Sequence, residues 1–149
     1  MEIDTDLGPI LGPKLVRLDP MTIRQLQGTK ISKAIDDFAK LSASAMQLRQ
    51  PLTSCDKLIN SDHTLYLLWE SLPNDNARSR VIGMLKVGRK HLFLYDKELK
   101  TYEGELIALL DFYVHMSCQR QGSGKKLFDY MLSSEHCQPY EIAFDSPNG

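Results

Sequence analysis

A glycine-rich loop between an apolar run and an amphipathic run is the part of this sequence best suited to chemistry. The loop, Gln119 to Gly124, follows the apolar run Leu109–Val114 and precedes the first turn of a predicted helix. At a helix start the backbone N–H groups lack partners and the helix dipole is positive, so such a loop can cradle an anion. Two glycines would let a phosphate approach the backbone closely, because no Cβ stands in the way. The spacing matches neither the GxxxxGK[ST] nor the GxGxxG phosphate loop.

Composition excludes several classes of protein. The 149 residues are 42% apolar and 25% charged, which predicts one domain with a real core, 1–149. A net charge of −1 gives no support for binding nucleic acid or an anionic membrane. No run approaches the roughly 18 apolar residues of a membrane span, and acids near Met1 argue against a signal peptide. Three widely spaced cysteines argue against a disulfide framework or a zinc site, and favour a reducing compartment.

The elements that would position the loop follow from periodicity. Helical spacing of apolar residues predicts a helix from Lys30 to about Leu48, and Thr53 or Ser54 could cap a second, short helix. A polar loop is predicted over 71–80 and a tight turn at Gly88–Lys90. Strands are predicted at Leu15–Leu18, His63–Trp69, Val81–Val87, His91–Tyr95, Leu106–His115 and Glu141–Phe144, and a last helix at Gly124–Leu132.

The order of these elements predicts an α+β fold. The sheet would be mostly antiparallel, with one right-handed strand–helix–strand crossover at the end. The run Leu106–His115 is apolar on both faces in its first half, which is typical of a central strand. The glycine-rich loop would then lie at the carboxyl end of this strand, where ligands bind in such sheets.

The signature Gln119-Arg120-x-Gly122-x-Gly124 after a long strand resembles that of the GNAT superfamily of N-acetyltransferases. Three further segments make the resemblance more specific: Leu109–His115, Lys86–Leu94 and Ala143–Pro147 are similar to the alpha-tubulin N-acetyltransferase family. The similarity extends from about Leu15 to Pro147 and includes features of the nematode members at 47–53.

This resemblance implies a GNAT-type fold and an acetyl-CoA-dependent enzyme. Its partners would be acetyl-CoA and a luminal lysine of alpha-tubulin in microtubules. The location would be cytoplasmic and microtubule-associated, including axonemes or neuronal processes. Neither a metal nor a covalent enzyme intermediate is implied. The implied cofactor-binding residues are Phe112, Tyr113, Val114, His115, Met116, Ser117, Cys118, Gln119, Arg120, Gln121, Gly122, Ser123, Gly124 and Lys125.

The resemblance also implies one catalytic carboxylate, and the predicted strands add a second candidate. Asp145 matches the family's carboxylate at the floor of the site, proposed there as a general base or proton relay. Asp111 lies on the neighbouring predicted strand, so both could approach the acetyl group. Each has an alternative: Asp145 could simply end a strand before a Ser-Pro turn, and Asp111 could be a structural ion pair or a hydrogen-bonded strand residue.

Three departures from the family pattern leave a rival reading open. Ala108 stands where the family has a cysteine, and Met46, beside Gln47, stands where it has a glutamine. The family domain continues after Pro147 with a helix and further strands, so this chain is expected to lack them. The rival is a truncated form with little catalysis that binds acetyl-CoA or tubulin. A nucleotide-binding module is disfavoured, because no Walker lysine or magnesium-binding Ser/Thr follows the loop.

Overall fold

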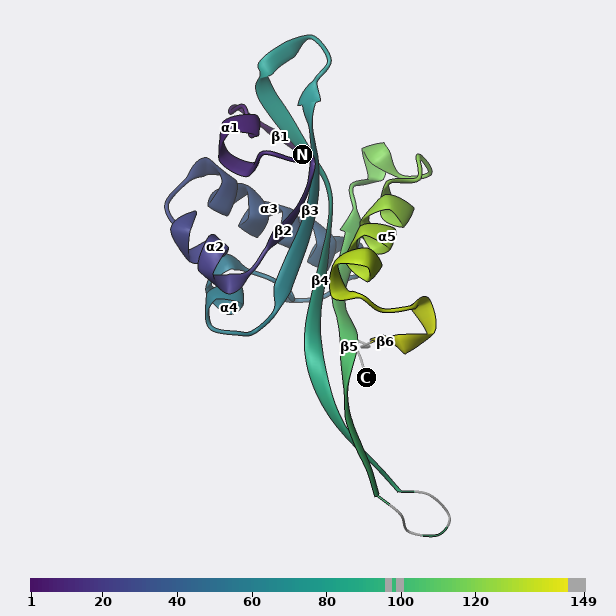
Figure 1. Ribbon diagram of the computed structural model, residues 1–149. Coiled ribbons are helices and arrows are strands. Elements are labelled where there is room, and N and C mark those ends of the chain that lie inside the picture. The colour runs from purple at the N-terminus through teal and green to yellow at the C-terminus, as the bar shows by residue number, and fades with distance from the viewer. Residues whose placement is uncertain (96–97, 99–100, 145–149) are drawn as a thin grey trace.

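A six-stranded, mostly antiparallel sheet organises the computed structural model, which describes residues 1–95, 98 and 101–144 (Figure 1). The strand order in these described residues is β2-β3-β4-β5-β6, and β1 pairs with β4. The expected α+β class is confirmed, and β5–β6 is the parallel pair joined by the expected helical crossover. The strands are β1 (Glu2–Ile3), β2 (Leu15–Leu18), β3 (Thr64–Leu72), β4 (Asp75–Tyr95), β5 (Thr101–Val114) and β6 (Ile142–Phe144).

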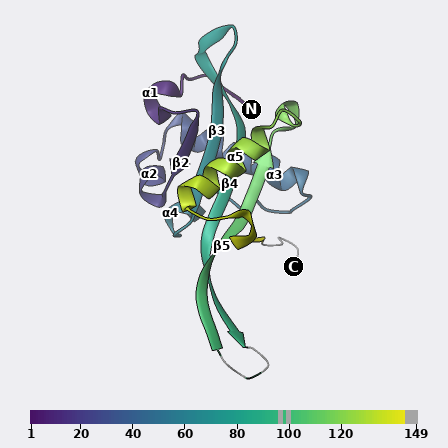
Figure 2. The same ribbon diagram turned by 45° about the vertical axis from the view of Figure 1, so that its right-hand side comes forward.

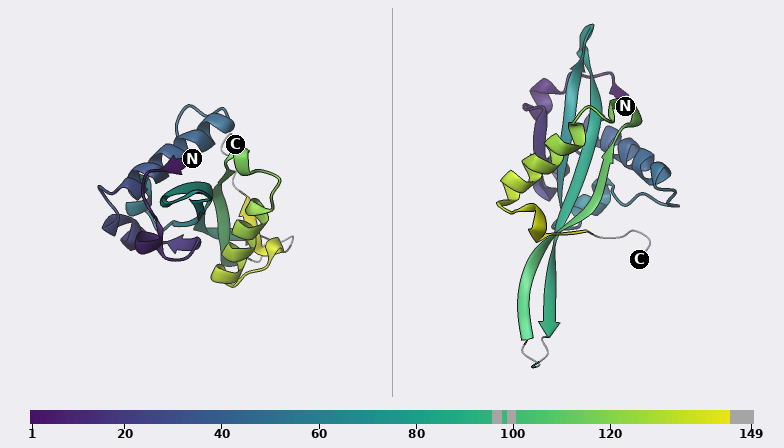
Figure 3. Two further views of the ribbon diagram at one scale, coloured as in Figure 1. Left: turned by 90° about the horizontal axis from the view of Figure 1, so that it is seen from above. Right: turned by 90° about the vertical axis from the view of Figure 1, so that its right-hand side faces the viewer.

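Helices cover both faces of the sheet. One face carries α1 (Gly8–Leu11), α2 (Pro20–Gln25), α3 (Lys30–Ala45) and α4 (Cys55–Ile59), and the other carries α5 (Ser123–Glu135) (Figure 3). Two short 3₁₀ helices, η1 (Met116–Cys118) and η2 (Pro139–Glu141), flank α5. None of the helices in the described residues is long and apolar enough to cross a membrane.

The buried strand β3 shows how the two layers share the sheet. Leu65 and Leu67 join the core under α3, whereas Tyr66 and Leu68 join the core under α5. This alternation follows from the two-residue period of side chains along a strand. Because both faces are covered, the strand is apolar at almost every position.

The first helical segment is largely as the sequence predicts. The helix predicted over 30–48 is observed as α3, which ends three residues earlier, and Gln47 beyond it has φ +58°. Ser54 rather than Thr53 caps α4, by accepting a hydrogen bond from the Lys57 amide at 3.1 Å. The sequence did not predict α2, which begins after Asp19; the Asp19 side chain accepts from the Thr22 amide at 2.8 Å.

Two predicted breaks in the strands were wrong. The predicted turn at Gly88–Lys90 lies inside β4, where Gly88 pairs with Ala108 and Lys90 with Leu106. Gly88 serves close packing rather than a turn, because a Cβ there would lie 2.7 Å from His63 Cδ2. The resulting long β4–β5 ribbon projects away from the helices (Figure 2).

The predicted polar loop over 71–80 is also mostly strand. β3 extends to Leu72, β4 begins at Asp75, and Ser71 pairs with Ser79. Polar residues are compatible with this hairpin because residues 73–77 near its turn are exposed to solvent. Periodicity could not show this, since pairing there buries little apolar surface.

A bulge interrupts β5 just before its functional segment. Lys86 pairs with Asp111 and the next residue, Val87, pairs with Leu109, so Leu110 has no pairing partner on β4. Among the described residues, β6 pairs with β5 only over Ile107–Leu109. From Leu110 onward, the outer edge of β5 therefore has no strand partner among the described residues.

Candidate cofactor-binding and active site

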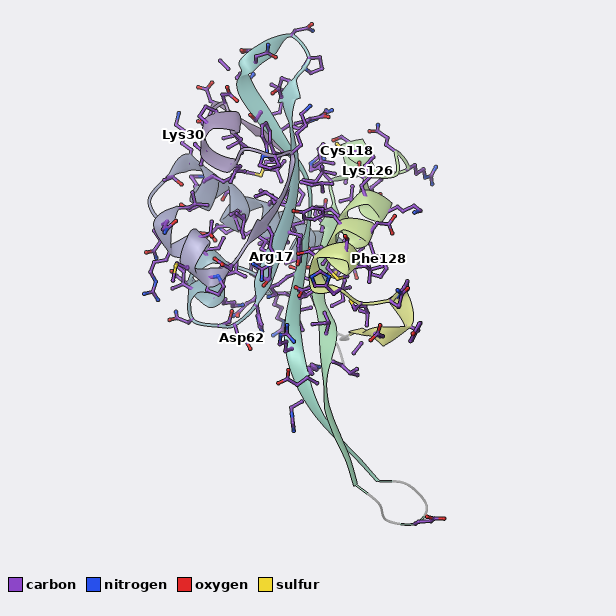
Figure 4. All side chains as sticks on the ribbon, viewed as in Figure 1. Arg17, Lys30, Asp62, Cys118, Lys126 and Phe128 are labelled. Atoms are coloured by element: carbon purple, nitrogen blue, oxygen red, sulfur yellow. The ribbon has the colours of Figure 1, made fainter. Side chains whose placement is uncertain are left out.

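The glycine-rich loop connects the open end of β5 to the start of α5, as predicted. His115 caps η1, and Gly122, with φ +78°, directly precedes the first residue of α5. Arg120 also has a positive φ, +66°. Cys118 and Lys126, both labelled in Figure 4, flank the loop on the α5 side of the sheet. The structure thus places the predicted strand, loop and helix in one continuous corner.

The backbone amides of this corner are available to a ligand. Among the described residues, no protein acceptor takes a hydrogen bond from the amides of residues 120–125. The next amide, Lys126 N–H, donates to Gly122 O at 3.1 Å and begins the hydrogen-bonded part of the helix. Unpartnered amides at the positive end of a 13-residue helix can bind a phosphate or pyrophosphate.

The two glycines of the signature have different structural roles. Gly122 adopts a left-handed conformation that side chains with a Cβ rarely take, although a Cβ there would meet no atom within 4 Å. Gly124 has no positive φ, and a Cβ there would contact Phe112 Cζ at 3.5 Å and Val114 Cγ2 at 3.6 Å. These are ordinary contacts with β5. The backbone conformation thus explains the glycine at Gly122, and neither constraint explains the one at Gly124; that the two glycines make room for a phosphate stays a prediction.

The predicted cofactor segment divides into exposed and buried residues. Ser123 and Cys118 are buried, and the other members, from Phe112 to Lys125, are half-buried or exposed. Gln119 Nε2 donates to Val114 O at 2.9 Å, which ties the loop back to the end of β5. The His115 ring accepts from the Ser117 amide at 3.2 Å, and burial lowers the pKa of this imidazole. The segment forms one connected wall along the open edge of β5.

Asp111 is placed differently from an exposed catalytic acid. Its side chain is 3% exposed and accepts hydrogen bonds from Ser42 Oγ at 3.0 Å and Thr53 Oγ1 at 2.7 Å. Across β4, Lys86 is 4% exposed and donates from Nζ to Leu52 O at 2.5 Å. Burial lowers the pKa of Lys86, and the negative charge of Asp111 acts in the opposite direction.

Sequence reasoning missed Ser42 and Thr53 as hydrogen-bond donors to Asp111, and Lys86 as its neighbour across the strands. Ser42 and Thr53 come from segments far from β5 in the sequence, so no spacing pointed to them. Lys86 left a signal, because it is the one charged residue in the apolar run Val81–Val87. A lysine inside a buried strand needs a partner, and a nearby carboxylate is the usual one.

Of the other predicted site positions, only Ala108 is shown to lie on the β5–β6 pair. Asp145 lies outside the described residues, directly after Phe144, whose backbone pairs with Leu109. Ala108, at the position of the family cysteine, is fully buried and pairs with Ala143. Met46 is half-buried and Gln47 is exposed, just beyond the end of α3. Asp145 as a catalytic residue therefore stays a prediction.

Comparisons with known proteins identify the family of the chain. The family model described as "GNAT acetyltransferase, Mec-17" matches residues 3–149. The chain is 60% identical to alpha-tubulin N-acetyltransferase 1 of Caenorhabditis elegans over 148 residues, covering 99% of this chain and 56% of that protein. It is 44% identical to the Aedes aegypti alpha-tubulin N-acetyltransferase, covering 80% of this chain and 43% of that protein. The chain thus spans about half the length of the curated relatives it matches.

A solved structure supports the fold alone. Arabidopsis thaliana NAA60, solved in complex with a bisubstrate analogue, superposes with a TM-score of 0.51 at 15% identity, covering 86% of this chain and 70% of that one. The signature loop, the open edge of β5 and the family match over nearly the whole sequence agree with one another. The chain belongs to the Mec-17 family of GNAT acetyltransferases.

Proposed function

We propose that this protein transfers the acetyl group of acetyl-CoA to a luminal lysine of alpha-tubulin in microtubules. The match to the Mec-17 family over residues 3–149 carries the proposal. The names of the C. elegans and Aedes relatives support tubulin as the acceptor. This function places the protein in the cytoplasm, on microtubules.

The main chain of the site fits acetyl-CoA. The pyrophosphate would bind the amides between Gln119 and Gly124; those of residues 120–125 have no protein acceptor among the described residues. The pantetheine arm would lie along 111–114, where the outer edge of β5 has no strand partner in the described part of the chain. An extended ligand beside a free strand edge gains main-chain hydrogen bonds, as an added strand does.

The chemistry is a direct attack of the lysine amine on the thioester. The new N–C bond forms as the C–S bond breaks, the CoA thiolate leaves, and the amine loses a proton. Free lysine has a pKa of about 10.4, so at pH 7 only a fraction on the order of one in a thousand is neutral. A carboxylate that removes the proton accelerates such a step by roughly 10²–10⁴-fold. We assign this base or relay role to Asp145.

A direct catalytic role for Asp111 stays a prediction. Its carboxylate is buried, and each oxygen already accepts a hydrogen bond, from Ser42 and from Thr53. These contacts favour a positioning role instead.

The test is an acetylation assay with labelled acetyl-CoA and polymerised tubulin. Wild type and an Asp62→Asn control should label tubulin, because Asp62 is an exposed carboxylate far from the loop (Figure 4). Asp145→Asn should lower labelling by at least a hundredfold while CoA affinity is kept. Mapping the label to a lysine by mass spectrometry tests the luminal assignment. Equal labelling by the Asp145→Asn variant would contradict the assigned base.

One observation favours a second candidate, a protein that binds acetyl-CoA or tubulin with little catalysis. Ala108 stands where the family has a cysteine, and it pairs with Ala143 beside the proposed reaction centre. Measurable CoA affinity without label on tubulin would support this candidate. An Ala108→Cys variant that then gains activity would identify the missing thiol as the cause.

A further inference from the structure

Two opposite charges are buried together at the bulge of β5. Lys86 and Asp111 are direct partners in the β4–β5 register, and both are almost fully buried. A buried charge is strongly unfavourable unless it is paired and hydrogen-bonded. Neither residue reaches solvent as a catalytic group would. Their burial therefore indicates a structural or positioning role.

We propose that Lys86, Asp111, Ser42 and Thr53 form a positioning network that holds the bulge of β5 and so presents the outer edge of 111–114 to acetyl-CoA. This inference rests on the proposed function, because it assigns how the same cofactor edge is held. It gives Asp111 a positioning role that acts through the β5 backbone.

The contacts converge on one short segment after α3. Asp111 accepts from Thr53 Oγ1 at 2.7 Å, and Lys86 Nζ donates to Leu52 O at 2.5 Å, so consecutive residues bind the two opposite charges. Ser42 Oγ, on the last turns of α3, donates to the other Asp111 oxygen at 3.0 Å. α3, the segment after it, β4 and β5 are thereby joined at a single point. No buried side-chain polar atom among the described residues lacks a partner.

These contacts lie at the bulge of β5, where they can influence the path of the strand. Leu110 has no partner on β4, and the β6 pairing of the described residues ends at Leu109, so in this part of the chain the ladder on both sides of β5 is interrupted within two residues. A bulge bends its strand and redirects the side chains beside it. Residues 111–114 resume pairing with β4 directly after the bulge, and the Asp111 side chain adds contacts to α3 and to Thr53 that hold the start of this segment. Preorganisation of this edge lowers the cost of binding an extended ligand.

Thr53 offers the sharpest test, because its hydroxyl can be removed without changing its shape. Thr53→Val removes the donor to Asp111, and Thr53→Ser keeps it. A hydrogen bond to a charged group contributes enough to change binding about tenfold or more when lost. We expect Thr53→Val to raise the Kd for CoA about tenfold and Thr53→Ser to stay within about twofold of wild type, by isothermal titration calorimetry. Ser42→Ala should weaken CoA binding in the same way.

Ser44→Ala is the matched control, since Ser44 lies on the same helix but is exposed. All measurements are made well below the melting temperature of each variant, so that a general loss of stability does not enter the Kd. A Thr53→Val variant with a lower melting temperature but an unchanged Kd for CoA would overturn the inference. A Thr53→Val variant whose KM for tubulin rises while its Kd for CoA is unchanged would overturn it as well.

Failure of the proposed function is separable from failure of this inference. If wild type binds CoA but transfers no acetyl group, the proposed function is wrong, and the network is still judged on the Kd values. If wild type transfers acetyl groups and Thr53→Val matches it in Kd and in KM for acetyl-CoA, the network alone is wrong.

Discussion

The imidazole of His63 lies directly over the backbone of Gly88 in β4, on the same face of the sheet as the side chain of Leu110 in β5. A Cβ on Gly88 would lie 2.7 Å from His63 Cδ2 and 2.8 Å from Leu110 Cδ1. Leu110 is the β5 residue that has no pairing partner on β4 because of the bulge. The absence of a side chain at Gly88 thus allows the bulge and His63 to pack against the same strand.

Gly88→Ala should destabilise the fold by about 1–2 kcal/mol, because the new methyl group overpacks this contact. Gly104→Ala is the control, since a Cβ there meets nothing within 4 Å. We expect the control to be neutral or slightly stabilising in urea unfolding. Adding His63→Ala to Gly88→Ala should restore part of the lost stability; no interaction between the two substitutions would contradict the packing account.

The two glycines of the signature loop should respond differently to alanine. Gly122→Ala must adopt a φ near +78°, which costs on the order of 1 kcal/mol and misplaces the loop amides. We expect weaker CoA binding and a lower melting temperature. Gly124→Ala should keep both, because its Cβ would make ordinary contacts with Phe112 and Val114. Calorimetric titration with CoA and thermal unfolding of both variants check this, and equal effects would refute the distinction.

Acidification should destabilise the protein partly through His63. Burial lowers the pKa of this imidazole from 6.5 in the folded state, with Lys86 adding to the effect and Asp62 opposing it. The unfolded chain therefore takes up the proton first, so stability falls as the pH drops below about 6.5, and the loss levels off below the folded-state pKa. His63→Gln should reduce the fall in the urea midpoint between pH 7.5 and 5.5.

Burial also lowers the pKa of His115, so the stability of the His63→Gln variant should still depend partly on pH. His136→Asn, at an exposed histidine after α5, controls for the removal of a histidine as such. An unaltered pH dependence in His63→Gln would show that its ring titrates alike in both states.

The three thiols should react in a set order. Burial raises the pKa of Cys55 to about 12, and Cys118 is buried in η1. Cys137 is half-buried, and burial with two nearby carboxylates raises its pKa. With iodoacetamide at pH 7.5, Cys137 should be modified slowly and first, and the other two only on unfolding. Peptide mapping in native buffer and in urea measures this order; rapid labelling of Cys118 in native buffer would be inconsistent with its burial.

Local signals in the sequence were enough for most elements. The helical stripe of Lys30–Ala45, the apolar runs of β3 and β5 and the strand–loop–helix order around Gly122 are visible because their side-chain periods are short. The similarity of short sequence segments to a known family also identified the family. The ends of strands were less predictable: the polar hairpin at Ser71–Ser79 and the continuation of β4 through Gly88 depend on a partner strand, and a single run of residues does not show its partner.

The sequence by itself determined the class of fold, the family and the strand–loop–helix order around Gly122, since each of these depends on residues that are neighbours in the chain. Only the tertiary structure decided the environment of Asp111. Its hydrogen-bond donors lie 69 and 58 residues away, on α3 and the segment after it, and Lys86 reaches it only through strand register. Whether a carboxylate meets solvent or is buried and bonded depends on which distant elements cover it. For that reason a residue predicted as a catalytic acid is found in a buried polar network.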